Sequence, residues 1–210
     1  MGKVKVKKTE VWIDMTPMSD VMVLLLTFFM LTSTFVKNEP VKVVTPGSVS
    51  EVKVPDVNVL SILVNPDGKI YMGLDKSGDA EDALMTMTDL FGVELTKKQV
   101  SAFKDQSMFG IPMEYLSAYL NMDQEQQLNA IKGSDAGIPT DSLTQADGTK
   151  GRSEFQEWVR ACKDANSDLK ITIKADEKTP YRVIKNVMSE LQDMNENRYQ
   201  LITSYKKQED

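Results

Sequence analysis

The chain has 210 residues, and 25 lysines and arginines against 31 aspartates and glutamates give it a net charge of −6 at pH 7. This length allows one globular domain beside a membrane anchor, and the acidic balance argues against binding to nucleic acid or anionic lipid. The chain has no histidine and a single cysteine, Cys162. These counts exclude Ser-His and Cys-His catalytic pairs, the usual zinc ligands and an internal disulfide bond.

The N-terminal residues 1–16 are basic and precede an apolar stretch at residues 17–36. Four lysines and two carboxylates give the first segment a charge of +2, which leaves −8 for the rest of the chain. Twenty residues in a helix reach about 30 Å, the thickness of the hydrocarbon core of a bilayer. The stretch has no clear signal-peptide cleavage site. We therefore expect an uncleaved transmembrane helix at 17–36 after a cytoplasmic N-terminal segment.

The next part of the chain predicts a linker, a β-hairpin and several helices. Residues 37–56 alternate valine with polar residues and contain three prolines, which is typical of a linker with some strand character. Two apolar runs at 57–64 and 69–72 flank the turn residues Asn-Pro-Asp-Gly and indicate a hairpin. Helices are expected at residues 80–91, 96–109 (with Thr96 as N-cap) and 112–132, then a loop at 133–151 and an amphipathic helix from Phe155 to Cys162.

The C-terminal part predicts a strand, a helix and a second strand. Residues 169–174 alternate strictly between apolar and polar, as a half-buried strand does. Thr179 and Pro180 are typical of an N-cap and a first helical residue, and residues 199–203 return as a strand. We therefore expect an α+β domain at 57–210 with a helical insertion at 74–167.

Asp20 lies inside the apolar stretch, where a charge is costly. A position near the helix start, where the helix dipole favours an anion, would be one explanation. However, Asp20, Thr27 and Thr34 are spaced by seven residues and Thr16 precedes them by one turn, so all four share one helix face. Such a stripe is expected to face protein or water, although threonines also bond to their own backbone. A carboxylate enclosed by partner subunits can carry protons, and one helix cannot form a channel alone.

Two motifs resemble the ExbD/TolR family of biopolymer transport proteins. The segment TPMSDVMVLLLTFFM, from Thr16 to Met30, resembles the family's membrane motif, with Asp14 at its first polar position and Asp20 as the membrane aspartate. Lys174-Ala175-Asp176-Glu177-Lys178 with Tyr181 is similar to a second element in the closing strand-helix-strand of the family. The hairpin also fits.

The resemblance implies a single-pass protein of the Gram-negative inner membrane, with its α+β domain in the periplasm. It implies a homodimer whose helices lie inside a pentameric ExbB/TolQ-like subunit. It also implies that protons crossing through Asp20 drive a TonB- or TolA-like partner, with Pro17 at the helix start and no cofactor besides the translocated proton. Ser19 and Thr27 replace apolar residues of the family pattern, and the 74–167 insertion exceeds its counterpart in short members, which leaves the exact partner open.

Two other functions remain open at this point. In one, the helix is only the tether of a signal-anchored periplasmic binding or scaffold protein. In the other, the chain is a stator-like subunit of a surface-motility motor. We do not expect an enzyme, because no nucleophile and base are paired in the sequence. Residues 75–81 and 143–154 partly match calcium loops but lack, respectively, the turn glycine and an acidic first ligand. Cys162 lies on an apolar helix stripe and is expected to be a small buried hydrophobe.

Overall fold

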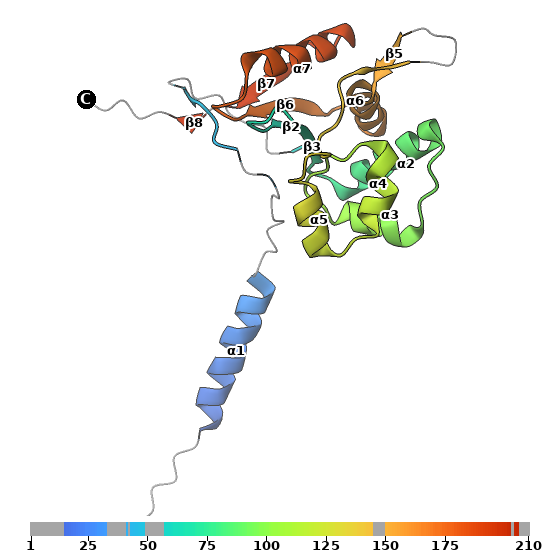
Figure 1. The fold of residues 1–210 in the computed structure, drawn as a ribbon. Helices are drawn as coiled ribbons and strands as arrows, with labels where there is room; N and C mark the ends of the chain where they lie inside the picture. The colour runs from blue at the N-terminus through green and yellow to red at the C-terminus, as the bar shows by residue number, and fades with distance from the viewer. Residues whose placement is uncertain are drawn as a thin grey trace, which may run out of the picture. The chain divides into compact units, whose positions relative to one another are not determined.

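The computed structural model describes residues 15–32, 41, 43–48, 57–144, 150–202 and 204–205. The chain separates into two compact units, Met1–Lys37 and Asn38–Asp210. The first unit contains α1, Thr16–Thr32, and the second contains the remaining elements (Figure 1). Each unit is described by itself.

The second unit has the predicted α+β order, in which a hairpin is followed by helices and then by strand, helix and strand. Its elements are β1 Gly47–Ser48, β2 Val59–Val64, β3 Ile70–Leu74, α2 Ser77–Phe91, α3 Lys97–Lys104, α4 Met113–Leu120, α5 Gln124–Ala130, β4 Ser142–Thr144, β5 Lys150–Ser153, α6 Glu154–Ala165, β6 Lys170–Ala175, α7 Tyr181–Asp193, β7 Tyr199–Ile202 and β8 Ser204–Tyr205.

The central sheet is mixed and has the strand order β3-β2-β6-β7. The β2–β3 hairpin is antiparallel, whereas β2 pairs with β6 and β6 with β7 in parallel. The hairpin turns at Gly68, whose φ of +80° favours glycine. Leu60, Ile62 and Val64 alternate along β2 and are completely buried, so this strand lies at the centre of the core.

The insertion covers the β3 edge of the sheet. Met72 and Phe109 exchange two backbone hydrogen bonds of 2.8 Å, and the Ile138 amide donates to the Ile70 carbonyl at 2.9 Å. Helices α2 to α5 gather on this side of the domain (Figure 1). An edge occupied in this way cannot pair with another chain.

Within the insertion, aromatic side chains join α3 and the segment after it to α6. Trp158 is completely buried, with its ring 4.6 Å from that of Phe109 and stacked on Phe103 at 6.1 Å. The Glu154 carboxylate accepts the Met113 amide at 3.0 Å and so holds the first residue of α4. Burial raises the pKa of Glu154 above its ordinary value.

Some predicted boundaries in the insertion are confirmed and others are wrong. Thr96 is the N-cap of α3, because its hydroxyl accepts the Gln99 amide and the Gln99 side chain accepts the Thr96 amide. The single helix predicted at 112–132 is wrong. The chain forms α4 and α5 instead, and Asp123 starts the second helix through a capping box.

Two further predictions need correction. The loop expected at 133–151 contains β4 and pairs it with β5 in an antiparallel ladder. The N-cap expected at Thr179 is wrong by one residue, since α7 begins at Tyr181 with Pro180 as its cap. The Thr179 hydroxyl donates instead to the Asn65 carbonyl at 2.9 Å and ties α7 to the hairpin turn.

The Cys162 thiol should be unreactive in the folded protein. It is completely buried, and this burial raises its pKa to about 12. Both effects deplete the reactive thiolate, so alkylation by iodoacetamide at mildly alkaline pH should be at least about a hundredfold slower than for an exposed thiol. Mass spectrometry of the native and the urea-unfolded chain would measure this difference, and equal rates in both states would contradict it.

Candidate functional site

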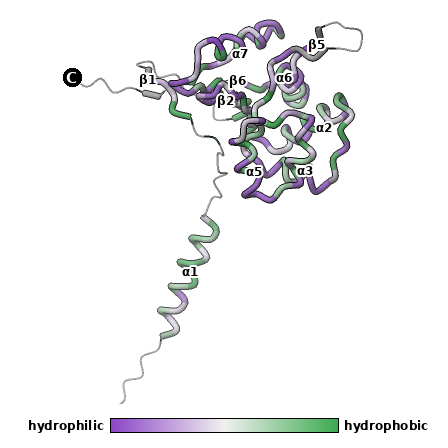
Figure 2. The backbone as a smooth tube through the Cα atoms, viewed as in Figure 1, coloured by the Kyte–Doolittle hydropathy of each residue, from purple (hydrophilic) through white to green (hydrophobic). Residues whose placement is uncertain are grey.

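Helix α1 is apolar and has no buried residue. The large hydrophobic side chains in it range from 50 % exposed at Leu25 to 87 % at Leu31, and most of the helix is coloured hydrophobic in Figure 2. Exposed apolar surface of this extent marks a contact with membrane or protein. Among the helices that the structure describes, none combines the length and the apolarity that crossing a membrane requires. The last four residues of the predicted span at 17–36, residues 33–36, lie outside the residues that the structure describes.

Asp20 is the single ionisable side chain in the sequence of α1. It lies in the second turn of the helix and is exposed. A helix turns by about 100° per residue, so Thr16, Asp20 and Thr27 lie on one face of α1. Thr34, the fourth predicted member of this stripe, lies outside the described residues.

The threonine hydroxyls of α1 bond within the helix. Thr27 donates to the Leu24 carbonyl at 2.9 Å, and Thr32 donates to the Phe28 carbonyl at 2.8 Å. Thr27 therefore has a partner without any neighbouring chain. Asp20 differs in kind, because a carboxylate that leaves water needs a proton, a cation or donor groups from elsewhere.

Pro17 is the second residue of α1. Proline lacks an amide hydrogen, and the first amides of a helix have no partner within the helix in any case. A helical hydrogen bond is present two residues later, where the Ser19 amide donates to the Met15 carbonyl at 3.1 Å. Pro17 is thus compatible with the first turn of the helix, which begins at Thr16.

Asp176 lies at the end of β6 and holds two separate segments of the domain together. Its carboxylate accepts the amide of Val44 at 2.8 Å and that of Lys178 at 3.0 Å. The Glu177 amide donates to the Val44 carbonyl at 2.8 Å. The two donated bonds, first that from Lys178 and then that from Val44, lower the pKa of Asp176. We call this contact between Val44 and Asp176–Glu177 the linker clasp.

Part of the predicted linker is therefore attached to the domain. Residues 43–48 belong to the second unit, and β1 pairs in parallel with β8. The sequence pattern of residues 37–56 indicated some strand character but not this partner. Two motif residues lie apart from the clasp: Lys174 lines a separate cavity of about 140 Å³, and Tyr181 is 73 % exposed at the start of α7.

The first calcium-like segment, residues 75–81, has structural roles. The Asp75 carboxylate accepts the amides of Asn58 at 2.7 Å and Val59 at 3.3 Å. Asp79 accepts the side-chain amide of Asn166 at 2.6 Å. The Asp75 carboxylate thus holds the start of β2, and the Asp79 carboxylate holds the loop between α6 and β6. The second segment, residues 143–154, lies partly outside the described residues.

Comparison with protein families decides what kind of chain this is. The family model described as biopolymer transport protein ExbD/TolR matches residues 6–206, nearly the whole chain. The chain belongs to the ExbD/TolR family. Neither the comparison with curated proteins nor that with solved structures gave a match.

Membership of the ExbD/TolR family places the chain in a broad functional class. The family is membrane-associated and serves transport and energy transduction, and it is not known as a family of enzymes. ExbD/TolR proteins work with partners of the ExbB/TolQ type. The match spans both the apolar helix with Asp20 and the closing strand-helix-strand with Asp176.

Replacing Asp176 by alanine should open the linker clasp of this ExbD/TolR protein. The Val44 and Lys178 amides lose their acceptor, so the Val44 amide should exchange with deuterium faster at neutral pH. The pKa of Asp176 is lowered below 3.8, so its contribution is present above pH 3.8 and is lost as the pH falls through the lowered pKa. The difference between the variant and the parent chain should shrink in that acidic range.

The control for this experiment is Asp176→Asn, which keeps one acceptor oxygen and should give an intermediate exchange rate. Hydrogen exchange read by mass spectrometry on peptides containing residues 43–48 measures the effect. An unchanged exchange rate in the alanine variant would show that the clasp does not hold the linker.

Proposed function

We propose that this ExbD/TolR protein is the proton-motive-force-coupled subunit of an inner-membrane complex in a Gram-negative bacterium. In this proposal residues 17–36 cross the membrane once from a cytoplasmic N-terminus, and the domain at 57–210 lies in the periplasm. The complex powers TonB- or TolA-like work at the outer membrane. One observation carries the proposal: Asp20 is the single ionisable group of an apolar helix without buried residues.

Asp20 explains why α1 would need an enclosing partner. A charged carboxylate near the centre of a bilayer costs about 2.5–3.5 kcal/mol on insertion scales. A pentameric ExbB/TolQ-like subunit around a homodimer of this chain would bury the apolar side chains of α1 and shield Asp20 from lipid. The Thr27 hydroxyl is already bonded within the helix. Asp20 is thus the group on this stripe that takes up and releases the transported proton.

The work is transmitted along the chain between Thr32 and Val44. Val41 and Val43 pack against the core of the domain, and the clasp bonds Val44 to the loop after β6, so in this proposal a displacement of α1 reaches the domain at this segment. The domain then passes the motion to the TonB- or TolA-like partner. The proton is the transported species, and the proposal requires no other cofactor.

Purification from membranes in mild detergent tests the assembly. A pentameric polytopic subunit should copurify with two copies of this chain, and the third component should identify the receiving partner. A chain that elutes alone, in every detergent that preserves a known complex of this type, would contradict the proposal.

A helix exchange separates proton coupling from simple anchoring. Replacing residues 17–36 by an unrelated apolar helix should leave the chain in the membrane but stop its work. A tethered binding or scaffold protein would keep working after this exchange, and that result would favour the tether over the proton subunit. A motility defect as the sole consequence would instead assign the chain to a surface motor.

A further inference from the structure

A groove of about 380 Å³ runs between α2 and α6, both within the predicted insertion. Met87 and Ala161 line it and are buried, so they form its floor. Leu90 is 56 % exposed and extends the apolar surface to the rim. Because Ala161 is small, the space beside Met87 stays open between the two helices. The groove thus offers a partner an apolar floor, as the centre of a protein interface does.

The rim of the groove is acidic. Asp89, Glu157 and Asp164 line it together with one base, Arg160. Helix α2 carries four carboxylates and no lysine or arginine; of these, Asp89 lines the groove, whereas Glu81 is paired with Lys104. A cation is therefore attracted to the groove, whereas an anionic glycan or nucleic acid is repelled.

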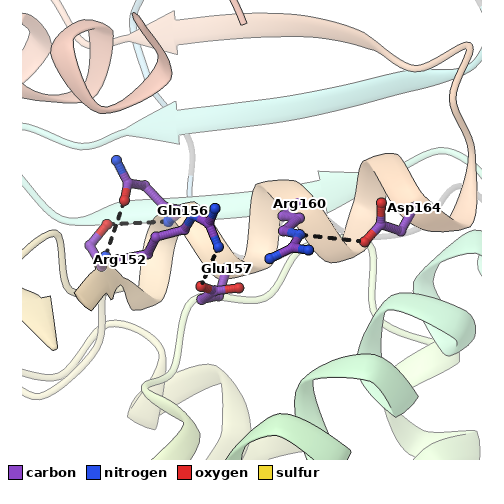
Figure 3. A network of polar contacts seen from close by, with 6 residues as sticks. Arg152, Gln156, Glu157, Arg160 and Asp164 are labelled. Carbon is purple, nitrogen blue, oxygen red and sulfur yellow. Dashed lines mark hydrogen bonds and ion pairs between the residues drawn. The ribbon is translucent and has the colours of Figure 1, made fainter. Parts of the chain in front are cut away.

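The ion pair that Asp164 makes at the rim is weak. Arg160 Nε lies 3.8 Å from Asp164 Oδ2, and both side chains are more than half exposed. Arg152 meets Glu157 at 3.5 Å from outside the groove (Figure 3). An exposed pair such as Arg160–Asp164 contributes little to stability, whereas the Glu157 side chain is only 15 % exposed. Asp89 has no ion-pair partner among the residues that the structure describes, so the rim can accept an incoming cation without losing a strong contact.

We infer that this groove binds a segment of a partner protein that presents a lysine or arginine beside a side chain of leucine or methionine size. The apolar side chain would cover Met87 and Ala161, and the cation would lie between Asp89 and Asp164. A second copy of this chain fits less well, since its net charge is −6. The inference concerns the insertion and is independent of proton transfer at Asp20.

Site-specific photocrosslinking in cells tests this surface on the full-length chain. A benzoylphenylalanine placed at Leu90 should crosslink to a partner, and sequencing of the crosslinked peptide should find a lysine or arginine beside an apolar residue. Asp89→Lys should reduce the crosslinked product by about tenfold, because like charges then face each other. Glu125→Lys on α5 changes the net charge equally but lies outside the groove, so it should have no effect. The same photoreactive residue at the exposed Tyr115 gives the background.

Charge exchange completes the test. Replacing the identified basic residue of the partner by glutamate should restore crosslinking to the Asp89→Lys chain. Three results would each overturn the inference. The first is crosslinking from Leu90 at the Tyr115 background level, and the second is crosslinking mainly to a second copy of this chain or to glycan. The third is equal crosslinking in the Asp89→Lys and Glu125→Lys chains. Circular dichroism of both lysine variants confirms that the comparison is between folded proteins.

Discussion

Replacing Asp20 by asparagine should abolish proton-driven work while the chain still inserts and assembles. Asparagine has nearly the same size as aspartate but does not titrate, so the helix face keeps its shape and loses the group that we propose as the proton carrier. Removal of a group that transfers protons typically costs a hundredfold or more in rate. We therefore expect proton flux through the reconstituted complex, measured with a pH-sensitive dye under an imposed potential, to fall at least about a hundredfold.

Two variants on α1 control for this result. Asp20→Glu keeps a titrating carboxylate and should retain part of the flux. Thr27→Val removes a hydroxyl that bonds to the Leu24 carbonyl in its own helix, so its effect on flux should be much smaller. Copurification of the partner subunit must be equal in all three variants. Full flux with Asp20→Asn and normal assembly would exclude Asp20 as the proton carrier.

The largest effect on stability is expected from Trp158→Ala. The indole is completely buried and contacts Phe103 and Phe109 of the insertion. Removing a buried aromatic ring leaves a cavity and typically costs about 3–5 kcal/mol, a large part of the stability of an ordinary domain. Denaturant unfolding of the full-length chain, followed by circular dichroism, should show this loss.

Trp158→Phe tests whether an aromatic ring at this position is enough to keep the packing. A phenyl ring still reaches the neighbouring aromatic rings, so this variant should be destabilised clearly less than the alanine variant. Hydrogen exchange should increase first in α3 and around Phe109, because these segments contact Trp158. An alanine variant as stable as the parent chain would mean that the insertion does not depend on this contact.

The order of helices and strands could be predicted from the sequence, because burial of one face gives apolar residues a regular spacing in each element. Alternation along residues 169–174 predicted β6, and the spacing of Phe155, Trp158, Val159 and Cys162 predicted α6. Helix ends were harder to predict, because they depend on single hydrogen bonds. Thr179 has the residue type of an N-cap, but its hydroxyl bonds to the Asn65 carbonyl across the fold. Likewise, the break between α4 and α5 depends on the capping box at Asp123.

The candidate site was predictable only in part. Asp20 is conspicuous in the sequence because an acid inside an apolar helix has few explanations, but one chain cannot reveal which groups enclose it. The linker clasp joins Val44 to Asp176, which are 132 positions apart in the chain. No local pattern encodes such a contact. The α2–α6 groove also depends on two helices meeting, and its small floor residue, Ala161, is ordinary in the sequence.

The position of the linker clasp decides how the domain carries mechanical load. A pull on Val44 is delivered to the loop after β6 through two hydrogen bonds, one to the Asp176 carboxylate and one from the Glu177 amide. Strand β6 has a neighbour on each side, β2 and β7. Tension therefore enters at an inner strand, where many ladder bonds share it, rather than peeling the sheet from its margin. Two hydrogen bonds form the clasp, whereas ladder bonds along both sides hold β6 in the sheet, so we expect the clasp to open at a force that leaves these strands paired.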